Sequence, residues 1–350
     1  MDRVDLAPGY SISRLIKGGW QLAGGHGEID CEAAIADMFR FVAAGITTFD
    51  CADIYTGVEE LIGEFLTRYR LEHGAQSASS IQVHTKFVPD LDGLATIDRP
   101  AVERSIDRSL TRLGVDRLDL VQFHWWDFDV ARYVEVASHL ADLRKAGKIR
   151  NIGLTNFDVP SLQAILGAGV PVVSHQVQYS LLDRRPERGM AELCRAHGVR
   201  LLCYGTLAGG FLSERYLGAA APAAPLENRS LVKYALIIDE FGGWTLFQDL
   251  LTALRTVADR HGVGVGAVAI RWLLDRPQVA AAIIGVRHAG HLNDTLAALS
   301  IHVTDEDVSV LRRVTEQARG PEGDVYSLER MKSGRHAAIM KYRLNAALTE

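Results

Sequence analysis

Eight short apolar runs alternate with longer amphipathic segments along this chain. The runs cover residues 14–20, 45–50, 81–86, 118–124, 149–155, 171–178, 199–205 and 279–285. Most are almost continuously apolar, as expected of strands that are covered on both faces. Parallel strands joined by helical crossovers form α/β folds, and eight of them can close into a (β/α)8 barrel. The sequence therefore predicts the TIM-barrel class.

Helix signals fill the segments between the runs. Residues 30–45 begin at Asp30, repeat apolar residues every three or four positions and end at a glycine. Residues 98–114 carry Pro100 in the expected first turn and also end at a glycine. The segment from residue 157 to 166 begins with the same acidic and proline signals. We expect each of these segments to be a crossover helix.

An open, doubly wound sheet is the structural alternative. Such sheets bind dinucleotides through a Gly-x-Gly-x-x-Gly turn that opens a helix directly after a strand. The nearest match, GGWQLAGGHG at residues 18–27, has different glycine spacing and does not open a helix directly. The barrel is therefore the favoured prediction.

Two extensions interrupt or follow the predicted barrel. The connection at residues 206–247, after the seventh strand, is abnormally long, and long connections are often functional covers. Aromatic residues flank its AAAPAAP stretch, so we predict a lid. The tail at residues 319–350 has a weak helical pattern from about 327 to 348. We predict one domain over residues 1–350, with the barrel at about 14–318.

Charge and composition exclude several classes of function. The net charge is −5, so there is no basic excess to neutralise nucleic-acid phosphates. The four cysteines are scattered without CxxC spacing, which indicates thiols in a reducing compartment. The N-terminus lacks a signal-peptide core, and no stretch is apolar enough to span a membrane. We predict a cytoplasmic protein with no nucleic-acid or membrane partner.

Polar residues stand at the ends of the predicted strands. In a barrel, the carboxyl ends of the strands build the active site, so polar groups there are expected and one alone means little. The combination is more informative. The strand-end residues are Asp50, Lys86, His124, Asn156, Gln176 and Tyr204, with Tyr55 just past the first of them.

Tyr55 is the candidate proton donor. A free phenol has a pKa near 10, and a neighbouring ammonium such as Lys86 would lower it. Asp50 could keep that buried lysine charged, so that Asp50 holds Lys86 and Lys86 tunes Tyr55 as a general acid. A neutral His124 could hydrogen-bond a substrate carbonyl oxygen and orient it.

These segments resemble the aldo-keto reductase family, and the resemblance runs from about residue 14 to 318. It rests on FDCADIYTGVEELIG at residues 49–63, HTK at 84–86 and LDLVQFHWW at 118–126. The resemblance implies a catalytic tetrad and an NADP(H) cofactor bound in extended form across the barrel mouth. The implied tetrad is Asp50, Tyr55, Lys86 and His124.

Further segments resemble the family's cofactor contacts. GGW, GLTNF and HQVQY imply nicotinamide-end contacts, with Gly19 replacing the family's usual Thr. YGTLAGGFLSERY implies a ring that stacks on the nicotinamide, followed by phosphate contacts. IIGVRHAGHLNDTLAAL implies the adenosine end, with three departures from the family pattern. The implied residues are Gly19, Trp20, Thr155, Asn156, Gln176, Tyr204, Gly205, Leu207, Gly209, Arg215, Gly285, Arg287, His291, Asp294 and Thr295.

Cofactor preference and substrate stay partly open. Arg287 favours the 2′-phosphate of NADP(H), because a guanidinium suits phosphate geometry, but NAD(H) remains an alternative. Aromatic residues at the mouth suggest an apolar or aromatic aldehyde or ketone, reduced to an alcohol. The predicted substrate contacts are Trp20, Tyr55, His124 and Trp125.

Three alternatives accompany the carbonyl reductase hypothesis. The same site could oxidise an alcohol or a sugar with NAD(P)⁺, and the sequence does not set the direction. A cofactor-binding regulatory subunit of the same family is the second. A metal-dependent barrel hydrolase is the third, since His84, His124 and His175 lie on predicted strands near Asp50. We expect no metal site, and the oligomeric state is not determined by the sequence.

Overall fold

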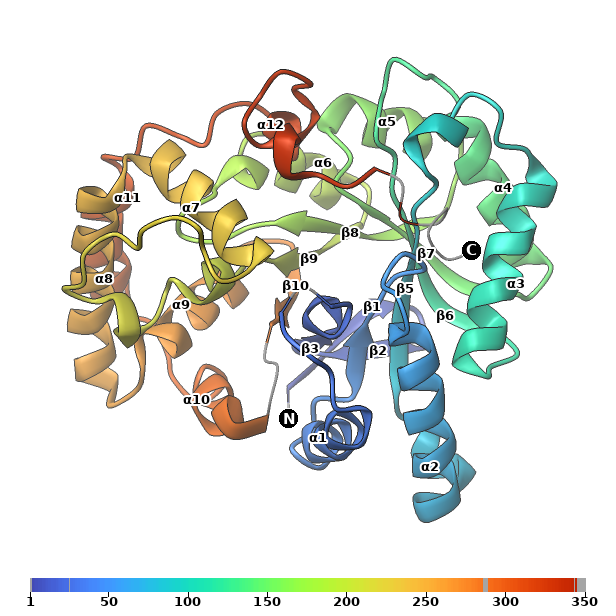
Figure 1. The fold of residues 1–350 in the computed structure, drawn as a ribbon, viewed down its shortest axis with the longest axis horizontal. Coiled ribbons are helices and arrows are strands. Elements are labelled where there is room, and N and C mark those ends of the chain that lie inside the picture. Colours follow the sequence, from blue (N-terminus) through green and yellow to red (C-terminus); the bar gives the residue numbers. More distant parts are fainter. Residues whose placement is uncertain (1, 25, 286–288, 343, 345–350) are drawn as a thin grey trace.

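The computed structural model describes residues 2–24, 26–285, 289–342 and 344 of the chain. Eight parallel strands close into a barrel in the order β10-β3-β4-β5-β6-β7-β8-β9 (Figure 1). Because β10 pairs with both β9 and β3, the sheet has no open edge, and the predicted (β/α)8 barrel is confirmed. The strands are β3 (Leu15–Gly18), β4 (Thr48–Asp50), β5 (Gln82–Phe87), β6 (Leu118–Phe123), β7 (Ile149–Thr155), β8 (Val172–Gln178), β9 (Arg200–Tyr204) and β10 (Val279–Ile284).

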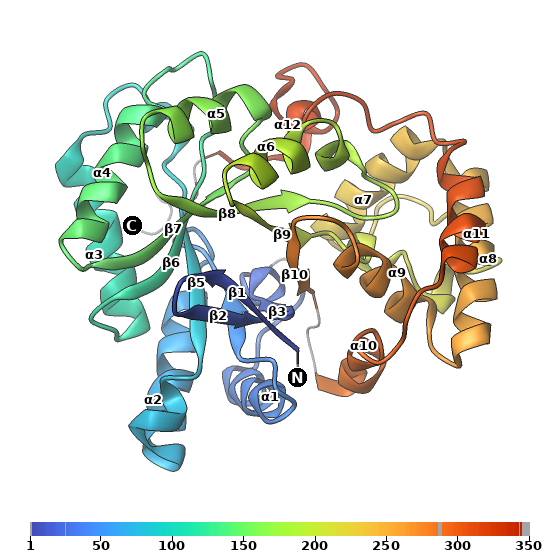
Figure 2. The same cartoon turned by 180° about the vertical axis from the view of Figure 1, so that it is seen from behind.

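Helices surround the barrel (Figure 2). Three of them begin as the sequence predicts, because the side chains of Asp30, Asp98 and Asp158 each accept a hydrogen bond from the first helical turn. The outer helices are α1 (Cys31–Ala43), α2 (Val58–Ala78), α3 (Arg99–Leu113), α4 (Tyr133–Lys145), α5 (Val159–Gly167), α6 (Met190–Ala196), α8 (Trp244–His261), α9 (Val265–Leu274), α10 (Leu292–Ala297) and α11 (Asp305–Thr315).

An N-terminal hairpin closes the end of the barrel opposite the strand carboxyl ends. It consists of β1 (Arg3–Ala7) and β2 (Tyr10–Ser13), which pair antiparallel. Ile12 belongs to the apolar cluster that includes Ile16 and Leu202 of the barrel strands. This hairpin was not predicted from the sequence, because its strands are short and carry charged residues on their outer face. The hairpin therefore packs on the barrel strands at the end opposite their carboxyl termini.

The predicted lid segment contains regular structure. It includes α7 (Arg229–Phe241), which begins where the Asn228 side chain accepts a hydrogen bond from Leu231 N. Its buried face includes Tyr234 and Ile238, which join the main core. The predicted long loop therefore contains a helix of its own, which contributes to the wall of the barrel mouth.

The predicted tail helix is wrong over most of its length. Within residues 327–342 the chain forms only α12 (Ser327–Arg330) and one short 3-10 turn (Ala337–Ile339). Backbone groups of the tail bond to other elements instead: Tyr342 O accepts from Leu91 N at 3.0 Å, and Ile339 O accepts from Arg229 at 3.1 Å. Tertiary hydrogen bonds have replaced the helical ones that the weak periodicity suggested.

Across the described residues, none of the helices combines the length and the apolar character needed to cross a bilayer.

The barrel floor gives a stability prediction. Ile12→Ala should lower the free energy of unfolding by about 2–4 kcal/mol, because Ile12 is fully buried and the change leaves a cavity. Denaturant unfolding measures this. Leu71→Ala is the matched control, since Leu71 is 83% exposed and should change stability by less than about 0.5 kcal/mol. Equal effects of the two changes would show that the hairpin is not part of the cooperative core.

Candidate active site

A cavity of about 700 Å³ opens at the carboxyl ends of the barrel strands. Its walls come from the ends of the strands, from α7 and from the C-terminal tail. Asp50, Tyr55, Lys86 and His124 all line it, although they lie on or just after three different strands. The fold thus brings the predicted tetrad together in one cavity.

Lys86 and Asp50 form a buried ion pair at the centre of this site. Lys86 Nζ donates to Asp50 Oδ2 at 2.6 Å and to the carbonyl oxygen of Cys51 at 2.8 Å. Their side chains are only 7% and 5% exposed. Burial opposes the charge on Lys86, but Asp50 and Tyr55 outweigh it and raise the lysine pKa above its ordinary value. The ammonium is therefore retained inside the barrel.

Two glutamines hold the other oxygen of the same carboxylate. Gln122 Nε2 and Gln176 Nε2 donate to Asp50 Oδ1 at 2.8 and 2.7 Å. Gln176 also donates to Gln122 Oε1 at 2.8 Å, which fixes both amides. Gln122 was not predicted as a site residue, although its position two residues before His124 places it on the same face of β6.

Tyr55 lies in the turn after β4, beside the ion pair. Lys86 Nζ is 5.0 Å from the centroid of its ring, and the ring of Trp20 lies 5.2 Å away on another side. Burial raises the pKa of Tyr55 above its ordinary value, and the charge of Lys86 only partly opposes this. The predicted net lowering of the phenol pKa is therefore not found, because desolvation of the phenolate is the larger effect.

The contact of His124 with the backbone defines its tautomer. Nδ1 lies 3.1 Å from the carbonyl oxygen of Thr155, and a carbonyl can only accept, so Nδ1 carries the proton. Burial lowers the pKa of His124 to about 3, which keeps the ring neutral. Nε2, which has no partner among the described residues, is then a hydrogen-bond acceptor. This differs from the prediction that His124 donates to a carbonyl oxygen.

Nine of the predicted cofactor contacts line the same cavity. They span the ends of several strands and the segment that follows β9. These residues are Trp20, Thr155, Asn156, Gln176, Tyr204, Gly205, Leu207, Gly209 and Gly285.

Asn156 and Tyr204 are joined within this group. The Tyr204 hydroxyl donates to Asn156 Oδ1 at 2.9 Å. Asn156 has a φ of 62°, a left-handed conformation that asparagine tolerates better than most residues. Both features hold the amide at the mouth of the barrel, next to the ring that the sequence analysis assigned to stacking.

Gly205 and Gly209 have a structural reason to be glycine. Both have positive φ, and a Cβ on either would lie within 3 Å of the Tyr234 side chain. Helix α7 therefore packs directly on the segment that the family resemblance assigns to the cofactor phosphates.

Other predicted cofactor residues lie outside the cavity lining. Gly19 donates its N–H to Asp50 O at 2.7 Å, and Gly18 lines the cavity in its place. Arg215 is 67% exposed and pairs with Glu227 at 3.3 Å.

The residues predicted to contact the adenosine end, His291, Asp294 and Thr295, do not line the cavity. His291 and Asp294 are exposed, and Thr295 is buried, with its hydroxyl donating to His291 O at 3.0 Å. Arg287 falls outside the described residues.

Trp126, and not Trp125, faces the cavity. Trp125 is fully buried, and its indole N–H donates to Asp127 O and Val130 O at 2.9 and 3.0 Å. Trp126 stands edge-on to His124, with ring centroids 4.3 Å apart. The prediction of Trp125 as a substrate contact is therefore corrected, because neighbouring residues at a strand end point in opposite directions.

Several lining residues come from the extensions and were not predicted. Arg229 and Lys233 project from α7, and Tyr326 and Met340 from the C-terminal tail. The predicted lid over the barrel mouth was the only signal in the sequence for these residues. The local sequence could not predict which residues of the extensions face the cavity, because this depends on how the extensions pack.

The histidines of the metal hydrolase alternative do not converge. His84 Nε2 lies 3.0 Å from the Tyr10 hydroxyl, toward the barrel floor. His175 Nε2 accepts from Phe157 N at 3.0 Å, and its other nitrogen faces Met190 Sδ. Over the described ranges, no group of three or more His, Cys, Asp or Glu residues is arranged to hold a metal ion.

Comparison with known proteins identifies similar chains. The model of the family described as "Aldo/keto reductase family" matches residues 14–316. A solved structure of a thermostable aldo-keto reductase, Tm1743, in complex with the inhibitor epalrestat, superposes with a TM-score of 0.70 at 26% identity. That match covers 90% of this chain and 100% of the other.

Of two curated relatives, one is named as an enzyme and the other as a flagellar protein. The NADH-specific methylglyoxal reductase of Escherichia coli (strain K12) is 24% identical over 326 residues, 87% of this chain and 95% of the relative. Flagellar radial spoke protein 5 of Chlamydomonas reinhardtii is 33% identical over 260 residues, 64% of this chain. The matched part spans 49%, about half, of that relative's length.

The ion pair gives a pH-dependent stability prediction. Asp50→Asn should lower the free energy of unfolding at pH 7 by about 3–5 kcal/mol, because it leaves the Lys86 ammonium buried without its counter-charge. In the variant, burial alone would lower the Lys86 pKa below its unfolded value. The unfolded state then binds more protons, so the variant gains stability as the pH rises from 7 to 9. The wild type should show no such gain from this group, since its Lys86 pKa is raised.

Denaturant unfolding at pH 7 and pH 9 measures both effects. The control is Asp142→Asn, because Asp142 is 40% exposed and its pair with Lys145 lies at the surface. A loss below about 1 kcal/mol for Asp50→Asn, or a loss that does not shrink with pH, would contradict the interpretation.

Proposed function

The chain belongs to the aldo/keto reductase family, and we propose that it is an NADP(H)-dependent oxidoreductase that reduces an aldehyde or a ketone to an alcohol. The observation that carries the proposal is the tetrad within one cavity. The Tyr55 phenol, the Lys86–Asp50 ion pair and His124 all line it, and His124 Nε2 has no partner among the residues that the structure describes.

The charge of the cavity suits a nicotinamide cofactor. Arg229 and Lys341 add positive charge to its lining, in addition to the Lys86–Asp50 ion pair. That excess favours a ligand with several negative charges. The Tyr204 ring would hold the nicotinamide, and Asn156, Thr155 and Gln176 would hold its amide. When bound, the cofactor supplies or accepts the hydride.

Tyr55 would supply the proton to the carbonyl oxygen as negative charge develops there. Its raised pKa keeps the phenol protonated through neutral pH. The ammonium of Lys86 would stabilise the phenolate that remains after transfer, and Asp50 with its two glutamine partners keeps that ammonium in place. The same groups in reverse would take the proton of an alcohol, so the arrangement supports either direction.

His124 would act as an acceptor in this scheme. With its proton on Nδ1, Nε2 can accept a hydrogen bond from the hydroxyl of the alcohol product, but it cannot donate to the carbonyl. The carbonyl would therefore be polarised mainly by the Tyr55 hydroxyl. His124 would then select the position of the hydroxyl group within the cavity.

A second candidate is a cofactor-binding protein without an essential reductase activity. It is favoured by the relative named as a flagellar radial spoke protein, which is 33% identical to the matched part of this chain. Turnover of a carbonyl by the purified chain decides between the two. The intact tetrad supports the enzyme.

Removing the phenol hydroxyl tests the proposed proton donor. Tyr55→Phe should lower kcat for carbonyl reduction by roughly 10²–10⁴-fold, because the general acid is lost while the ring remains. Absorbance of the reduced cofactor follows the reaction over a panel of aldehydes and ketones. Tyr133→Phe, on α4, is the matched control and should keep full activity. Full activity of Tyr55→Phe would refute the assignment of the donor.

A cofactor titration tests the proposed preference. Quenching of protein fluorescence should show at least about tenfold tighter binding of NADPH than of NADH, if a cation contacts the 2′-phosphate. Trp20 lines the cavity next to Tyr55 and provides the signal. Tighter or equal binding of NADH would instead favour the preference named in the Escherichia coli relative.

A further inference from the structure

Lys233 is an ammonium in the cavity that the proposed chemistry does not use. It projects from α7 and lines the cavity, and its side chain is 16% exposed. Nζ lies 5.2 Å from the centroid of the Tyr204 ring and 5.3 Å from that of Tyr326. The faces of the two rings favour a cation there, but they do not replace the hydrogen bonds that an ammonium makes in water.

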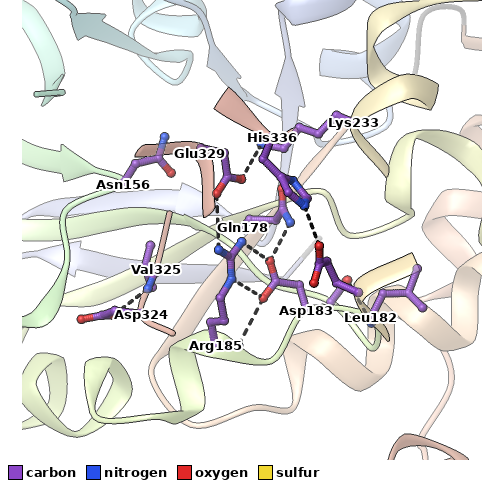
Figure 3. A network of polar contacts seen from close by, with 12 residues as sticks. Asn156, Gln178, Leu182, Asp183, Arg185, Lys233, Asp324, Val325, Glu329 and His336 are labelled. Carbon is purple, nitrogen blue, oxygen red and sulfur yellow. Dashed lines mark hydrogen bonds and ion pairs between the residues drawn. The ribbon is translucent and has the colours of Figure 1, made fainter. Parts of the chain in front are cut away.

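Its one carboxylate neighbour within the described ranges is a poor partner. Lys233 Nζ is 3.4 Å from Glu329 Oε1, and that oxygen has no hydrogen-bond partner among the described residues. Figure 3 shows Glu329 between Lys233 and Arg185. Arg185 contacts Glu329 Oε2 at 3.3 Å and pairs with Asp183 at 2.7 Å. The negative charge of Glu329 is therefore shared between two cations.

Glu329 and Arg185 also make this part of the wall rigid. Arg185 donates to both oxygens of Asp183, at 2.9 and 2.7 Å, and Gln178 donates to Asp183 Oδ2 at 2.6 Å. These residues join the end of β8, the loop after it and α12. The ammonium of Lys233 therefore lies against a fixed wall, and apart from its 3.4 Å contact with Glu329 Oε1 no described group accepts a hydrogen bond from it.

The position of Lys233 favours the substrate over the cofactor as the source of the missing acceptor. Tyr326 contacts both Lys233 and the tetrad: its ring centroid lies 5.3 Å from Lys233 Nζ, and the ring stands edge-on to His124 with centroids 5.7 Å apart. The first turn of α7 lies elsewhere: the Arg229 guanidinium is 5.7 Å from the Trp20 ring, and Ser230 packs on Gly209. Lys233 is thus one helical turn beyond the segment that would hold the cofactor phosphates.

We propose that Lys233 binds a carboxylate on the substrate, so that the enzyme prefers aldehydes or ketones that carry an acid group. The inference rests on the proposed reductase function and narrows its substrate class. The aromatic walls formed by Trp20, Trp126 and Tyr326 would hold the carbon skeleton between the carbonyl and the carboxylate. Lys233 would be a specificity residue, since it contacts neither the carbonyl nor the transferred hydride.

A matched pair of substrates tests the proposal. The acid is 4-carboxybenzaldehyde, and its uncharged partner is methyl 4-formylbenzoate. The wild type should show a kcat/KM at least about tenfold higher for the acid, since a charged hydrogen bond in a desolvated site is worth that factor or more. Lys233→Met should bring the ratio close to one, and Lys233→Arg should retain most of it. Because each ratio is measured on one preparation, it does not depend on how much of a variant is folded.

Lys145→Met is the charge control. It removes a lysine of α4 that is 77% exposed, and it should keep the wild-type ratio. A ratio near one in the wild type would overturn the proposal, and so would an unchanged ratio in Lys233→Met.

Two further measurements test the anion site separately from cofactor binding and from the proposed reductase activity. Dissociation constants for NADPH and NADH are compared between the wild type and Lys233→Met. Weaker binding of both cofactors with an unchanged acid-to-ester ratio would assign Lys233 to a cofactor phosphate and overturn the proposal.

The last measurement applies if the wild type reduces neither aldehyde, because the anion site is then tested by binding and not by turnover. Calorimetry then measures the binding of 4-(hydroxymethyl)benzoate and of its methyl ester, which tests the anion site without turnover. Tighter binding of the acid, lost in Lys233→Met, supports the site. Equal or absent binding of the two compounds overturns it.

Discussion

The buried ion pair between Lys86 and Asp50 is the interaction around which the site is built. Burial by itself lowers the pKa of Lys86, and the adjacent carboxylate of Asp50 outweighs this and raises it. Gln122 and Gln176 then satisfy the second carboxylate oxygen, so that no charged atom of Asp50 is left bare. Because β4, β5, β6 and β8 each contribute one of these groups, the pair also links the strands at the mouth of the barrel.

The electrostatics of the remaining tetrad follow from burial. Desolvation raises the Tyr55 pKa and lowers that of His124, so both side chains are neutral at pH 7. Lys86 does not make Tyr55 strongly acidic in the free protein. Its stabilising effect would be greatest when a phenolate forms beside it, which is the state that the proposed proton transfer would produce. A group that acts on the charged state in this way accelerates the reaction without ionising the resting enzyme.

The two extensions turn an open barrel mouth into an enclosed cavity. Helix α7 packs on the glycines after β9, and the tail bonds to Leu91 and Arg229. The buried charges of Asp183, Arg185 and Glu329 connect the tail to the barrel at the same place. Lys233 owes its position to this packing, which adds a cation to the cavity lining.

Local sequence determined the barrel strands, several crossover helices and the tetrad. Apolar runs, capping residues and polar strand ends each act over a few neighbouring residues, and the barrel then places all strand ends at one mouth. The tertiary structure alone decided which residues at the barrel mouth face the cavity. Trp126 faces it, and not Trp125 as predicted. The tertiary structure also decided the proton position on His124, through the carbonyl of Thr155 on the next strand, and the placement of Lys233, through the packing of α7 and the tail. These features depend on contacts between segments far apart in the chain, and no local pattern encodes the distance between such segments.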